Sequence, residues 1–220
     1  MTRKFLLVCG ILSSVMYIFM DVVSGLRYDG YSFAAHTVSE LSALGATTRP
    51  PMLLLGAGYQ ALVTLFAIGV FASARRKRDL RVAGAFLMAY GLIGFTAPFF
   101  SMQQREVIAT AGPILTDRLH LVATAIAVLL MFTAIAFASK AYGRAFRLYS
   151  IATILVSFAF GTLTSRAAPR MEAGLPTPWI GITERICIGV FLLWVVVFAV
   201  LLLRRTEERP IAASRADLAA

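Results

Sequence analysis

Two histidines and a small set of carboxylates are the residues of this chain that could carry out chemistry. The stretch "HTVSELSALG" at 36–45 is densely polar in a sequence that is 59% hydrophobic. It contains His36, Ser39 and Glu40, whose side chains can transfer protons, attack a substrate or bind a metal ion. We therefore expect these three side chains to face a polar pocket.

The same stretch also has a purely structural interpretation. "TVSE" matches a capping box, in which Thr37 and Glu40 each bond the backbone amide of the other. Gly45 suits the C-terminal cap of the helix that would follow. The pattern thus predicts a short helix over 38–44, and Glu40 then serves as a cap.

Further ionisable residues lie within or next to apolar segments. "TDRLH" places Asp117 and His120 three residues apart on one helical face, although Asp117 also suits a helix N-terminus. A charge at the membrane centre costs roughly 2.5 to 3.5 kcal/mol, so Asp21, Glu184 and Arg185 need partners. We expect Glu184 to pair with Arg105 or Arg118, and Arg185 to pair with Asp21, Glu40 or Asp117.

The elements that position these residues are apolar segments. Mean hydropathy is +0.80 and only 15% of the residues are charged, which is typical of membrane proteins. Helices are expected because an open sheet leaves backbone groups unpaired in lipid. We predict an all-α, polytopic bundle of six transmembrane helices within a domain at 1–203. The predicted spans are 5–25, 52–74, 82–102, 115–139, 148–163 and 179–203.

Basic residues indicate the orientation. About two thirds of the 21 Lys and Arg residues lie on the side of the N-terminus if six spans are counted. This bias predicts a multi-pass protein of the bacterial cytoplasmic (inner) membrane, with the N-terminus and the C-terminus in the cytoplasm. The polar segment 204–220 is expected to form a disordered cytoplasmic tail.

Charge and cysteine content exclude several partners and bonds. The net charge of +10 is spread over loops that face anionic lipid, so membrane lipids are the expected partners and nucleic acid is not. Cys9 and Cys187 lie at opposite depths, so neither is expected to form a disulfide.

Three stretches resemble a known family. "YSFAAHTVSELSALGATTRP", "DRLH" and "GITERICIGVFLLW" are similar to the bacterial membrane family catalogued as domain of unknown function 998. The resemblance extends from Leu7 to about Leu203. It implies a six-span inner-membrane protein of unassigned activity, so it supports the topology and supplies no chemistry.

Several functions fit these residues. The favoured one is a polar pocket on the extracytoplasmic side, formed by Asp21, His36, Ser39, Glu40, Asp117, His120, Glu184 and Arg185, that binds or transports a lipid headgroup or small solute. The alternative is a metal-dependent intramembrane hydrolase acting on a lipid-like substrate, with His36, His120 and Asp117 as zinc ligands and Glu40 as base. Alkaline ceramidase-like hydrolases are loosely similar but use three histidines. A bis-histidine haem is a further option, although both imidazoles would lie at the water boundary.

Overall fold

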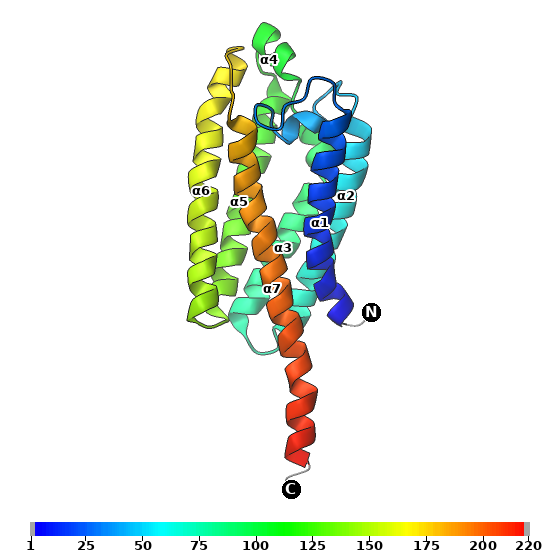
Figure 1. Cartoon of the computed structure of the whole chain (residues 1–220), viewed down its shortest axis with the longest axis vertical. Helices are drawn as coiled ribbons and strands as arrows, with labels where there is room; N and C mark the ends of the chain where they lie inside the picture. Colours follow the sequence, from blue (N-terminus) through cyan, green and yellow to red (C-terminus); the bar gives the residue numbers. More distant parts are fainter. Residues whose placement is uncertain (1–2, 218–220) are drawn as a thin grey trace.

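The computed structural model describes residues 3–217, and the side chains of residues 3–205. In this part the chain forms seven α-helices, two 3-10 helices and no strand (Figure 1). They are α1 (Arg3–Arg27), η1 (Ser39–Ser42), α2 (Arg49–Ser73), α3 (Arg78–Gly94), η2 (Ala97–Phe100), α4 (Arg105–Ala111), α5 (Leu115–Lys140), α6 (Arg144–Glu172) and α7 (Ile180–Asp217). The all-helical prediction is confirmed.

Five helices are long and apolar enough to cross a membrane, namely α1, α2, α5, α6 and α7 up to Arg205. The chain is therefore a multi-pass membrane protein. The predicted third span at 82–102 is the exception, because α3 has 17 residues and ends at Gly94. Pro98 lacks an amide hydrogen, and its ring would clash with the carbonyl four residues earlier, at Gly94, so α3 ends there and the chain turns into η2. A sixth full crossing remains a prediction.

The long helices form a ring in chain order. α1 packs on α2, α2 on α3, α3 on α5, α5 on α6, α6 on α7, and α7 closes the ring against α1. Consecutive helices run in opposite directions, and the short α4 lies at the end of the ring that carries the longer connections (Figure 1). This arrangement surrounds a central space with side chains from every long helix except α6.

Two helices extend beyond their predicted ranges. The fifth predicted span, 148–163, lies within α6, which continues through Pro169 to Glu172. The segment expected to be disordered from 204 onward is continuous with α7 as far as Asp217, and 218–220 lie outside the described residues. α7 extends past the end of the ring opposite to α4 (Figure 1).

Small residues allow the first three helices to approach closely. A Cβ on Gly69 of α2 would lie 2.9 Å from the Leu6 Cβ and 3.1 Å from the Leu6 backbone on α1. A Cβ on Gly84 of α3 would lie 3.0 Å from the Phe71 backbone on α2. Close backbone approach gains dispersion energy in lipid, where apolar burial gives no drive for association.

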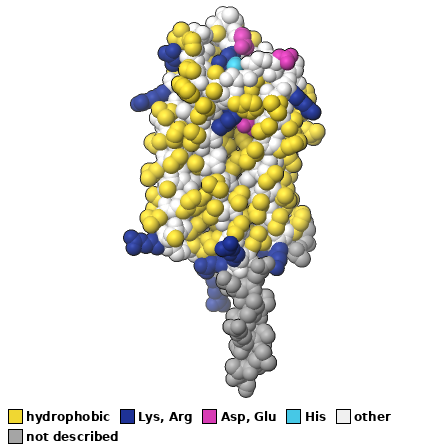
Figure 2. Space-filling view, viewed as in Figure 1, with side chains coloured by type: hydrophobic (Ala, Val, Ile, Leu, Met, Phe, Trp, Pro, Cys, Tyr) yellow, Lys and Arg dark blue, Asp and Glu magenta, His cyan; other side chains and the backbone are white. Residues whose placement is uncertain are grey.

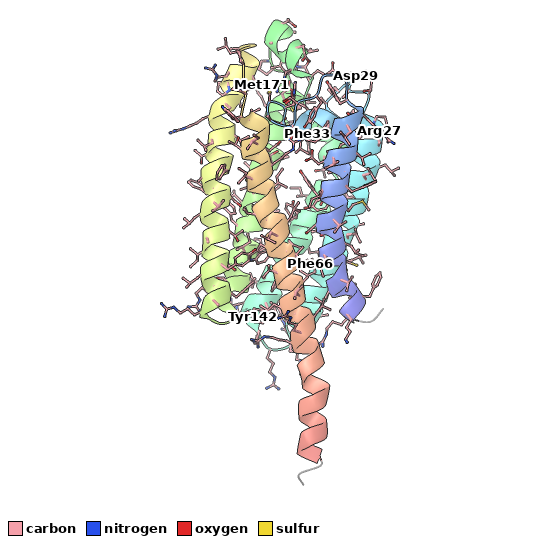
Figure 3. The ribbon with its side chains drawn as sticks, in the orientation of Figure 1. Arg27, Asp29, Phe33, Phe66, Tyr142 and Met171 are labelled. Atoms are coloured by element: carbon pink, nitrogen blue, oxygen red, sulfur yellow. The ribbon has the colours of Figure 1, made fainter. Side chains whose placement is uncertain are left out.

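The half of the ring opposite to α4 is filled by apolar side chains. Its core contains the fully buried rings of Phe66, Trp194 and Phe198. In Figure 3, Phe66 and Tyr142 lie in this half, whereas Asp29, Phe33 and Met171 lie at the opposite end. Apolar side chains cover the flank of the molecule, and acidic side chains are seen only toward the end with α4 (Figure 2). The ionisable side chains that could carry out chemistry are thus concentrated at the end with α4.

Candidate functional site

The connection between α1 and α2 folds over the end of the ring as a loop, residues 28–48, which contains η1. The predicted helix at 38–44 is shortened to this 3-10 turn, with Val38 as its N-cap. Half of the expected capping box forms, because the Thr37 amide donates to Glu40 Oε2 at 2.6 Å. The Thr37 hydroxyl also donates to Glu40 Oε2. Gly45 has the positive φ of +85° that suits a terminating glycine.

Arg105 of α4 holds Glu40 in place. Its Nε lies 2.5 Å from Glu40 Oε1 and its Nη2 lies 2.8 Å from Glu40 Oε2, a two-pronged contact. Nη2 also donates to the Ala35 carbonyl. Burial lowers the pKa of Arg105, but the neighbouring Glu40 carboxylate raises it by more, so the pKa lies above its usual value. Arg105 therefore stays charged and ties α4 to the loop.

A second arginine ties the loop to α7. Arg185 Nε and Nη2 donate to the two carboxylate oxygens of Asp21 on α1 at 2.9 and 2.8 Å, which confirms one of the expected pairs. Arg185 Nη1 donates to the carbonyls of Phe33 and His36, and Nη2 donates to the Tyr31 hydroxyl. Burial raises the pKa of Tyr31, so its hydroxyl stays protonated and donates to the Thr37 carbonyl.

Glu184 pairs with neither Arg105 nor Arg118 in the structure, contrary to the expectation from sequence. Its Oε2 accepts a 2.5 Å hydrogen bond from the Val38 amide, just before η1. Arg105 is paired with Glu40 instead. Glu184 of α7 thus binds the backbone of the loop.

His120 contacts the loop from the opposite side of the ring. Its Nδ1 lies 2.9 Å from the Phe100 carbonyl, and its Nε2 lies 3.2 Å from the Ser39 hydroxyl. Both residues are partly buried. Ser39 and His120 were each predicted from the sequence to face a pocket, but not to contact each other. In the structure they form a hydrogen bond although they are 81 residues apart in the chain.

His36 and Asp117 serve local structure. His36 Nδ1 accepts from the Ser32 amide at 2.9 Å, and its ring stacks on Tyr31. Asp117 accepts from the Ile114 amide at 2.8 Å as an acid near the start of α5 does, and also from Gln103. His36 thus acts within the loop, and Asp117 caps α5 and ties it to the segment before α4.

The expected zinc ligands are not brought together. Within residues 3–205, no three His, Cys, Asp or Glu side chains lie close enough to hold a metal ion. Each of His36, His120 and Asp117 makes a different set of hydrogen bonds instead. Zinc and haem binding remain predictions from the sequence.

A cavity of about 300 Å³ lies under the loop, inside the ring. Polar groups reach it from the loop and from α2, α3, α5 and α7. They include Ser39, Gln60, Tyr90, His120, Glu184 and Cys187. The wall further from the loop is apolar, with Ala127 and Met131 on α5 and Phe191 on α7. Most polar groups of the lining thus lie toward the loop, Gln60 reaches the wall from the middle of α2, and the part lined by Met131 and Phe191 is apolar.

A groove of about 290 Å³ runs between α1 and α7 on the outside of the ring. Asp21 and Arg185 lie among its lining residues, and the rest of the lining is mainly apolar. Tyr17 and Ile188 line both this groove and the central cavity. These two side chains therefore form the partition between the membrane-facing groove and the interior.

Several residues of the site were not singled out from the sequence. Gln60 Oε1 is buried without a hydrogen-bond partner among the described residues, at the cavity wall. The hydroxyls of Tyr59 and Tyr90 lie 2.9 Å apart at a similar depth. A glutamine in the middle of the apolar run "GYQALVTLF" was the available signal for this polar region.

Comparisons with known proteins identify a family and no activity. Residues 11–201 match the model of a family described as a protein of unknown function (DUF998). No curated protein and no solved structure matches the chain. Because the match covers most of the sequence, including the loop and every long helix, the chain belongs to the DUF998 family.

Proposed function

We propose that this membrane protein takes up a single-chain amphipathic ligand, such as a lipid with one acyl chain, into the cavity of its helix ring. The observation that carries the proposal is the graded wall, with most of its polar groups toward the loop and an apolar part lined by Met131 and Phe191. An acyl chain fits the apolar part, and a headgroup or ester linkage fits the polar part. Binding is favoured over transport because the described spans include no pair of broken helices at mid-depth.

Cavity size supports a small ligand. A volume of about 300 Å³ is at the lower end of the range for ligand pockets, roughly 300 to 1,000 Å³. This space favours one chain over a two-chain phospholipid. Gln60 Oε1, buried without a partner in the described chain, would gain a hydrogen bond from a polar ligand group or water.

The groove between α1 and α7 supports entry from the membrane. Asp21 and Arg185 provide a polar contact for a headgroup, and Tyr17 with Ile188 separates the groove from the cavity. Movement of these two side chains would connect the two spaces. A ligand would then never need to leave the lipid to reach the interior.

We also infer that the loop end faces away from the cytoplasm of a bacterial inner membrane. The opposite end carries the exposed basic turn of Arg75, Arg76, Lys77 and Arg78, and such residues are retained on the cytoplasmic side. Within residues 3–205, only Asp79 among the acids lies at that end. The ligand would accordingly come from the outer leaflet.

Thiol labelling tests the binding proposal. Cys187 lines the cavity, whereas Cys9 is fully buried in the apolar core and can be replaced by Ala. In the Cys9→Ala protein, N-ethylmaleimide should label Cys187, and a lysophospholipid or a fatty acid should slow this labelling about tenfold or more. A labelling rate that neither ligand changes would contradict the proposal.

A further inference from the structure

Ser39 and His120 form a pair that binding alone does not require. We propose that Ser39 is a nucleophile and His120 its general base, and that together they hydrolyse an acyl ester held in the cavity. This inference rests on the proposed binding function and adds a reaction and a substrate class to it.

Hydrogen bonding fixes the direction of the proton in this pair. The Phe100 carbonyl can only accept, so in a neutral imidazole the Nδ1 of His120 carries the proton. Nε2 then has a free lone pair and accepts from the Ser39 hydroxyl, 3.2 Å away. A serine, a base and a third group that orients the base are the parts of an activated nucleophile. Here the orienting group is a backbone carbonyl.

The neighbours of Ser39 hold it rigidly. The amide just before it, at Val38, is bonded to Glu184 of α7, and the residue just after it, Glu40, is bonded to Arg105 of α4. Val38 and Glu40 are each 4% exposed. Nucleophiles gain rate from such positioning, because the reacting atoms need no reorganisation. Ser39 is thus held by contacts to α7 and α4 on either side of it, in addition to its own contact with His120 on α5.

Both reacting groups face the space for the ligand. Ser39, His120 and Glu184 line the cavity with Met131, so the cavity follows α5 for about 16 Å below the histidine. An ester whose carbonyl carbon lies at Ser39 can therefore extend its acyl chain along this apolar wall. The chemistry that fits is a single-chain acyl ester, with its alcohol part toward the loop.

The reaction balances with water as the second substrate. Ser39 Oγ attacks the ester carbonyl while its proton passes to His120 Nε2, and the bond to the alcohol oxygen breaks as Nε2 returns that proton to the alcohol. An acyl-Ser39 intermediate remains. Water then attacks it with His120 as base, which releases the carboxylic acid and restores the serine hydroxyl.

A fluorophosphonate with an alkyl chain tests the inference in the purified full-length protein. We expect covalent labelling that mass spectrometry maps to Ser39. Ser39→Ala should abolish it, and His120→Gln should slow it about 100-fold or more, the lower limit for loss of a general base. Matched controls are Ser32→Ala in the same loop and His36→Gln, the only other histidine, which should label as the wild type does.

The outcomes separate the reaction from the binding. If Ser39→Ala and the wild type both bind lysophospholipid and neither reacts with the probe, the nucleophile is wrong and the binding function stands. Labelling at Ser42, or an undiminished rate in His120→Gln, would also overturn the inference. If no variant binds lysophospholipid, the binding function itself is wrong. Hydrolysis of a p-nitrophenyl acyl ester by the wild type and its loss in Ser39→Ala would complete the positive case.

Discussion

Arg185 connects more of the site than any other side chain described above. It contacts the carboxylate of Asp21 with two nitrogens, two loop carbonyls with a third, and the Tyr31 hydroxyl. The exposed fractions of the Arg185 and Asp21 side chains are 20% and 13%. Removing one member of such a pair leaves a charge with poor solvation, which costs more than the pair itself contributes.

Arg185→Met should therefore destabilise the protein by about 3 kcal/mol, or on the order of 10 °C in detergent. The double variant Asp21→Asn with Arg185→Met should recover part of this loss, because no charge is then left unpaired. Thermal unfolding of the purified proteins measures both effects, with the exposed Asp29→Asn as the control. Equal stability of Arg185→Met and wild type would contradict this role.

Arg105 should control the mobility of the loop. Arg105→Lys keeps the charge but loses the planar fork that contacts Glu40. We expect hydrogen exchange at the amides of residues 37–41 to become about tenfold faster. Arg118→Lys is the matched control, since Arg118 is exposed one turn into α5. Unchanged exchange in Arg105→Lys would show that the loop is held by other contacts.

Pairs within one local motif could be predicted from the sequence, and pairs across the ring mostly could not. The bond between Glu40 and the Thr37 amide follows from the spacing of a capping box. The pair of Arg185 with Asp21 was one of three predicted pairs. A charge inside the membrane needs a partner, but this requirement does not identify which residue the partner is. The contact between Ser39 and His120 depends on how the helices pack into a ring, and no local sequence pattern predicts that packing.

At the scale of elements, the glycines of the first three helices set the spacing of the ring. Gly69→Ala should destabilise by about 1 to 3 kcal/mol, because the new methyl meets the Leu6 backbone. Gly189→Ala is the control, since a Cβ there has no neighbour within 4 Å. Thermal unfolding in detergent compares the two. A Gly69→Ala protein as stable as Gly189→Ala would refute the tight packing of α1 on α2.

Helix positions were predictable and helix ends were less so. Apolar runs located all six long segments, because lipid requires about 20 apolar residues for each crossing. α3 ended early at the turn before Pro98, and α6 passed through Pro169 to Glu172. α4 was missed because its seven residues carry no apolar run. The positions at which these helices begin and end are set by prolines and by packing near the loop, and not by hydropathy.

Basic and acidic residues are distributed unevenly between the two ends of the ring, and we expect this difference to set the orientation of the whole molecule in the membrane. In a protein without native cysteines, Asp29→Cys should react with an impermeant maleimide in intact cells, because residue 29 is exposed on the loop end. Arg76→Cys, exposed at the opposite end, should react only after the cells are opened. The reverse pattern would invert the orientation and place the cavity at the cytoplasmic face.

The central claim is that the ring encloses a site for one acyl chain. The most direct measurement is the amount of single-chain lipid that native mass spectrometry finds on wild type, Ala127→Trp and Ile126→Trp. Ala127 lines the cavity, whereas the neighbouring Ile126 is 41% exposed on the outside of α5. We predict bound lipid on wild type and Ile126→Trp and its loss from Ala127→Trp. Equal lipid on all three proteins would contradict the claim.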